Sequence, residues 1–111
     1  MKIIQLNTPE GFAQCDFILF ISGMISILKS WHSVEISTLL LHMPLNTEYT
    51  IQGNDNSNTK ISYDSNNANQ LTISLHTEDN TSRQIVEVIR EYLPNYNRLA
   101  FEELREICND F

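Results

Sequence analysis

The stretch FILFISGMISIL, residues 17–28, constrains the fold more than any other part of this chain, which is otherwise polar and rich in Asn. A membrane-spanning helix needs about 20 predominantly apolar residues. This run is shorter and is bounded by Asp16 and Lys29. An apolar ligand pocket would be marked by convergent polar groups, and the stretch shows none. We therefore expect a buried core helix.

The predicted helix extends from about residue 9 to residue 31. Thr8 supplies a capping hydroxyl, Pro9 suits the first helical position, and Glu10 is an acid in the first turn. A broad apolar side leaves only a narrow polar stripe, which is typical of a helix surrounded by other elements. The residues of the apolar side are Phe12, Leu19, Phe20, Met24, Ile27, Leu28 and Trp31.

Periods of two follow the helix and predict strands. The run VEISTLLLHM starts by alternating and then becomes continuously apolar, which indicates a strand buried on both faces that ends at Pro44. Three further runs each have one apolar and one polar face: TEYTIQ, KISYDS and QLTISLH. Asn-rich turns between them favour antiparallel pairing in a meander of four strands. MKIIQLN opens the chain as a further short strand.

The helical period returns in NTSRQIVEVIREYLP, where Thr81 and Gln84 match a capping box and Pro94 forces an end. Its predicted buried stripe is Ile85, Ile89, Tyr92 and Leu93. A last amphipathic helix is expected from about residue 98 to near residue 111. The prediction is a single α+β domain over residues 1–111: a short N-terminal strand, a long buried helix, an antiparallel four-stranded meander and two C-terminal amphipathic helices.

The charge of the chain favours one class of partner. Its formal net charge is -7, and residues 61–111 carry 9 acids against 4 bases. A negative surface repels phosphate and anionic lipid and steers basic protein surfaces. We expect a basic protein as partner and no direct contact with nucleic acid or membrane.

Catalytic and cofactor motifs do not occur. With 3 Gly in the whole chain, phosphate-binding glycine loops are excluded. The three histidines lie far apart on different predicted elements, without the spacing of metal ligands. Cys15 and Cys108 are expected to be reduced, partly buried thiols without a nearby base. We expect no enzyme activity, no cofactor and no metal. Because the N-terminus lacks a secretory pattern, we expect a cytoplasmic protein.

The acidic sides of the two C-terminal helices are the candidate partner surface. Tyr92 and Tyr96, on either side of Pro94, would add the aromatic anchors that interfaces favour. The candidate residues are Glu87, Glu91, Tyr92, Tyr96, Glu102, Glu103, Glu106 and Asp110. The alternative interpretation is ordinary surface charge, paired locally with Arg83, Arg90, Arg98 and Arg105.

Three functional hypotheses follow. The first is a binding module that neutralises a basic partner, in the form of a bacterial immunity or antitoxin-type inhibitor of a nucleic-acid-cleaving toxin. The second is a ligand-binding or enzymatic domain on the polar sheet face, using Asp64, Thr72, Ser74 and His76. The third is an accessory subunit that associates with a copy of itself.

Overall fold

The computed structural model describes residues 1–30, 33, 35–42, 46–53, 56–64, 70–76 and 79–96, with the backbone alone over 39–42. Five strands and two helices lie within these ranges: β1 (Lys2–Asn7), α1 (Gln14–Ser30), β2 (Ile36–His42), β3 (Asn46–Gly53), β4 (Asn58–Asp64), β5 (Gln70–Leu75) and α2 (Asn80–Tyr92). The predicted α+β class is confirmed. The predicted last helix, from residue 98, lies outside the described residues.

The strands form one antiparallel sheet in the order β1-β5-β4-β3-β2. The four later strands pair consecutively, and the sheet has five strands and not four because the predicted N-terminal strand, β1, pairs along its whole length with β5. Ile4 lies opposite Ile73, and Leu6 lies opposite Leu71. Paired residues share a face of the sheet, so β1 extends the same apolar face that β5 carries.

The strand β2 occupies the last place in the strand order, next to β3. The predicted burial on both faces concerns mainly residues 39–42, whose side chains lie outside the described part of the structure. Ser37 and Thr38 are exposed. A continuous apolar run does not by itself distinguish a central strand from an edge strand, because the run says nothing about the neighbours.

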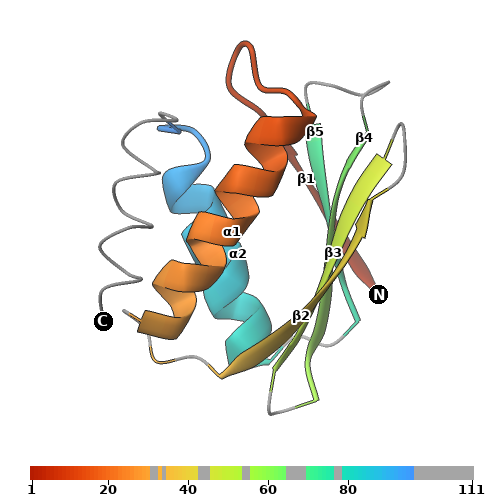
Figure 1. Ribbon diagram of the computed structural model, residues 1–111. Helices are drawn as coiled ribbons and strands as arrows, with labels where there is room; N and C mark the ends of the chain where they lie inside the picture. The colour runs from red at the N-terminus through yellow and green to blue at the C-terminus, as the bar shows by residue number, and fades with distance from the viewer. Residues whose placement is uncertain are drawn as a thin grey trace.

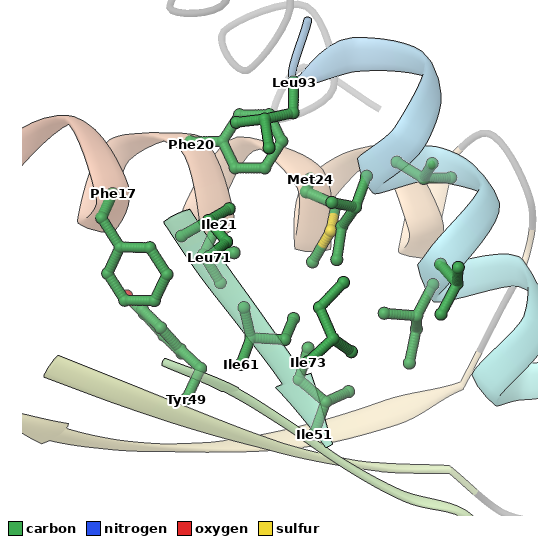
Figure 2. Packing of buried hydrophobic residues seen from close by; sticks show 14 of the residues in the cluster. Phe17, Phe20, Ile21, Met24, Tyr49, Ile51, Ile61, Leu71, Ile73 and Leu93 are labelled. Carbon is green, nitrogen blue, oxygen red and sulfur yellow. The ribbon is translucent and has the colours of Figure 1, made fainter. Parts of the chain in front are cut away.

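Both helices lie on one side of the sheet, as Figure 1 shows. The buried side of α1 packs against alternate residues of the central strands, whose side chains point toward it (Figure 2). The largest fully buried side chains are Tyr63, Phe17, Phe20, Ile21, Met24, Ile27, Leu28, Ile51, Ile61, Leu71, Ile73 and Ile85. The apolar stretch that opened the sequence analysis is thus the centre of the core.

The helix α1 begins at Gln14 and not near residue 9. Gly11 has φ +77°, a left-handed conformation that a helix cannot contain, and the N–H of Phe12 donates to the carbonyl of Pro9 in a turn. The side chain of Asp16 accepts a hydrogen bond from the N–H of Ala13 at 3.0 Å. Asp16 is the third residue of the helix and accepts from the residue that precedes the helix, so the helix start is stabilised by Asp16 and not by Thr8 as the sequence suggested.

The helix α2 is capped by Asp79 and not by the predicted Thr81. The Oδ1 atom of Asp79 accepts a hydrogen bond from the N–H of Ser82 at 3.1 Å. The helix ends at Tyr92, before Pro94. Its buried side is broader than the predicted stripe, because Val86 and Val88 are buried beside Ile85 and Ile89.

Phe20 tests the core directly. Its side chain is fully buried, with its ring 6.4 Å from that of Phe12 and 5.7 Å from that of Tyr96. We expect Phe20→Ala to lower the free energy of unfolding by about 3–5 kcal/mol, because it leaves a cavity beside Phe12 and Tyr96. Urea denaturation measures this change. The exposed Ile3 is the control: Ile3→Ala should cost less than about 1 kcal/mol, and equal costs at the two sites would contradict the packing.

The cap of α2 gives a second prediction. Asp79→Ala should destabilise the protein by about 1 kcal/mol, because the N–H of Ser82 loses its acceptor. Thr81→Ala should cost less, since Thr81 follows the cap. Thermal unfolding followed by circular dichroism compares the two variants. A larger loss for Thr81→Ala would restore the capping box predicted from the sequence.

Candidate functional site

The predicted acidic surface is only partly described. Glu87 and Glu91 are exposed on the outer side of α2. Arg83 and Arg90 are exposed on the same helix, so its described outer side carries two acids and two bases. The charge of α2 alone is therefore balanced, and any acidic excess depends on the residues that follow it. Those candidates, Glu102, Glu103, Glu106 and Asp110, lie outside the described residues.

The two predicted aromatic anchors are half-buried and pack against the core. The ring of Tyr96 lies edge-on to Phe12 at 5.5 Å, and its hydroxyl donates to the Oδ1 atom of Asp16 at 3.4 Å. Tyr96 therefore holds the chain after α2 against the start of α1. Only the remaining exposed part of its side chain is left for a partner.

Tyr63 lies beneath this contact. Its hydroxyl donates to the carbonyl of Phe12 at 2.9 Å, and its ring stacks on Phe17 at 5.7 Å. Burial raises the pKa of the Tyr63 phenol above its ordinary value, and the negative charge of Asp16 raises it further. The phenol is thus held in its neutral, donating form.

The polar sheet face does not bring the second set of candidates together. Thr72 and Ser74 alternate with buried residues of β5, on the face opposite the helices. Tyr63, next to Asp64, is opposite Leu71, whereas His76 is five residues further along the chain. Continuing this register places Asp64 level with Gln70, six residues from His76, so at about 3.3 Å per residue the two are separated by roughly 20 Å along the strands. The four residues are spread over the sheet and do not line one site.

Candidate metal ligands and thiols can be compared with the part of the chain that the structure describes. No cluster of three or more His, Cys, Asp or Glu that could hold a metal ion occurs there. Cys15 is exposed, not partly buried as predicted, because it lies in the first turn of α1 on the side away from the core. Cys108 lies outside the described residues. Among the described helices, none is long and apolar enough to cross a membrane.

A groove between β1 and α2 is the feature that the sequence did not indicate. It encloses about 330 Å³. Its floor is formed mainly by Ile4, Leu75 and Val86, and its charged rim by Lys2, Arg83, Glu87 and Arg90. Residues 2 and 83–90 lie close together because β1 pairs with β5. The groove could therefore have been predicted from the sequence only if this strand pairing had been predicted. The groove carries three cations against one carboxylate.

A larger cavity of about 580 Å³ lies near the opposite edge of the sheet, where α1 ends and β2 begins. Lys29 and Glu35 are the charged residues that line it. Because these charges are of opposite sign, the cavity favours neither an anion nor a cation. We therefore regard the smaller groove beside β1 as the more informative feature.

No protein-family model, no curated protein and no solved structure matches the chain. Function is therefore inferred from geometry and charge alone.

Tyr63 predicts a pH dependence of stability. Because its pKa is raised in the folded protein, Tyr63 stabilises the fold fully below the unfolded pKa of 10.0, and this contribution is lost as pH rises through the raised pKa. We expect the free energy of unfolding to fall as the pH rises from 10.0 toward the raised pKa of the folded protein. Tyr63→Phe should lower the free energy of unfolding by roughly 1 kcal/mol at neutral pH, because the hydrogen bond of the hydroxyl is lost. In the alkaline range, the free energy of unfolding of this variant should decrease less steeply with pH than that of the parent protein. Urea denaturation across the alkaline range measures both slopes; identical slopes would contradict the raised pKa.

Proposed function

We propose that the chain is a small acidic cytoplasmic module that binds and neutralises a basic protein. The observation that carries this proposal is the exposure of Glu91 on a helix whose other side is fixed in the core by Ile85 and Ile89. The backbone of a packed helix is already ordered, so binding costs only the freedom of the exposed side chains that meet the partner.

The charge of the whole chain supports the same partner class. The net charge is -7, and four of the 14 acids stand at positions 102, 103, 106 and 110, soon after α2 in the sequence. An acidic surface accelerates encounters with basic proteins and repels nucleic acid. We assign the partner contact mainly to Glu91 and these later acids, because Arg83, Glu87 and Arg90 line the groove beside β1.

The specific form that we propose is a bacterial immunity or antitoxin-type inhibitor of a nucleic-acid-cleaving toxin. The active site of such a toxin is lined by Lys and Arg that contact phosphates, and excess carboxylates complement it. The chain would act by covering that site, which requires no cofactor or metal of its own.

Binding to a nuclease encoded by a neighbouring gene tests the proposal. We expect inhibition of cleavage, and an affinity that falls by at least about tenfold when salt rises from about 50 to 300 mM, because the contact is electrostatic. Glu91→Lys with Glu103→Lys should weaken binding by about tenfold in calorimetric titration.

The matched control is Glu35→Lys with Glu48→Lys, which changes the net charge equally at positions next to β2 and on β3. This control should bind within about threefold of the parent protein. Affinity that is indifferent to salt would contradict the proposal, and so would equal weakening by the two double variants.

A further inference from the structure

We propose that the groove between β1 and α2 is a separate binding site, which takes an acidic peptide segment as an added strand on β1. This site goes beyond the neutralisation of a basic partner, because its charge preference is opposite to that of the acidic surface.

The backbone of β1 provides the first argument. Within the described residues, β1 ends the strand order and pairs only with β5. In an antiparallel ladder, alternate residues direct their N–H and C=O groups to opposite sides, so about half of those of β1 point away from β5. Such an edge is a template onto which an extended peptide can add as a strand.

The side chains of this edge provide the second argument. Met1 and Ile3, exposed by 80% and 57%, are the exposed large apolar side chains of the described part of the chain. Ile3 pairs with Ser74 and thus lies on the face opposite the helices. Edge strands usually carry charges, prolines or bulges that discourage pairing. The strand β1 has one such charge, Lys2, which lines the groove, whereas its other face offers the apolar side chain of Ile3 to a neighbouring strand.

Charge provides the third argument and identifies the peptide. The structure describes five Lys and Arg residues, and three of them, Lys2, Arg83 and Arg90, line the groove. The other two are Lys29 and Lys60. In a chain of net charge -7, this concentrates cations along one side of one strand. Lys and Arg bind carboxylates through charge-assisted hydrogen bonds.

The pleat of the sheet then gives the sequence pattern that the site would recognise. Successive side chains of an added strand point to opposite faces. One set would enter the groove beside Arg83 and Arg90, and the other set would lie beside Ile3. A peptide that alternates acidic and apolar residues satisfies both faces.

A fluorescein-labelled peptide of four Glu-Val repeats tests this pattern by fluorescence anisotropy with the full chain. We expect saturable binding. A Lys-Val peptide of the same length should not bind, and a peptide of four Glu followed by four Val should bind at least about tenfold more weakly. Absence of saturable binding by the Glu-Val peptide at millimolar protein would overturn the proposal, as would equal binding by the block peptide.

Substitutions in the protein locate the site. Arg83→Glu with Arg90→Glu should weaken binding of the Glu-Val peptide by at least about tenfold. Lys29→Glu with Lys60→Glu makes the same charge change away from the groove and should stay within about twofold of the parent. Circular dichroism and the melting temperature establish that each variant is folded. If both double variants weakened binding equally, the peptide would be attracted by the positive charges of the protein in general and not by the groove, and the proposed site would be wrong.

Backbone methylation separates strand addition from ion pairing. N-methylation of the peptide amides that face β1 should abolish binding, whereas methylation of the alternate set should leave it, because only the first set donates to the strand. If both methylated peptides bind as tightly as the parent peptide, strand addition is wrong. A dimer in sedimentation that the Glu-Val peptide does not dissociate would show that a second copy covers β1, which also contradicts the proposal.

Discussion

Burial of one side of α1 against the sheet is the contact on which the rest of the structure depends. Phe17 and Met24 are fully buried on the side of α1 that faces the strands, and Phe20 is fully buried beside Leu93 (Figure 2). Without this helix, the alternating strands would expose a continuous apolar face to water, which the hydrophobic effect disfavours. The same contact determines which face of the sheet is buried and which is exposed. The helices cover one of them, and the polar side chains of the strands line the other.

Packing of α2 beside α1 follows from this arrangement and creates the wall of the groove. Val86 is buried and also lines the groove floor, so one residue serves both the core and the candidate site. Arg83 and Arg90 are then placed over β1 by a helix that is capped at Asp79. At the other end, the contacts of Tyr96 with α1 hold the chain that follows the helix. The groove is therefore a consequence of how the core closes.

Sequence patterns predicted local burial well and long-range pairing poorly. The apolar period located α1, and alternation located the later strands, because both patterns reflect which side of a segment is buried. The partner of β1 was not predictable in this way, since pairing with β5 joins residues about 70 positions apart. The sequence analysis predicted Thr8 and Thr81 as helix caps, whereas the structure has Asp16 and Asp79 in this role. Several neighbouring polar side chains could accept the hydrogen bonds from the first N–H groups of a helix, so the sequence does not choose between them. The groove was missed because its cations come from segments that only the pairing of β1 brings together.

Amide hydrogen exchange of the free protein, resolved by residue, tests most directly whether β1 is an open edge beside the groove. In β4, which has a strand on each side, every amide should be protected. In β1, alternate amides that point away from β5 should exchange close to the rate of exposed amides, and their neighbours should exchange slowly. Uniform protection along β1 would contradict the account, because it would mean that the edge is already covered.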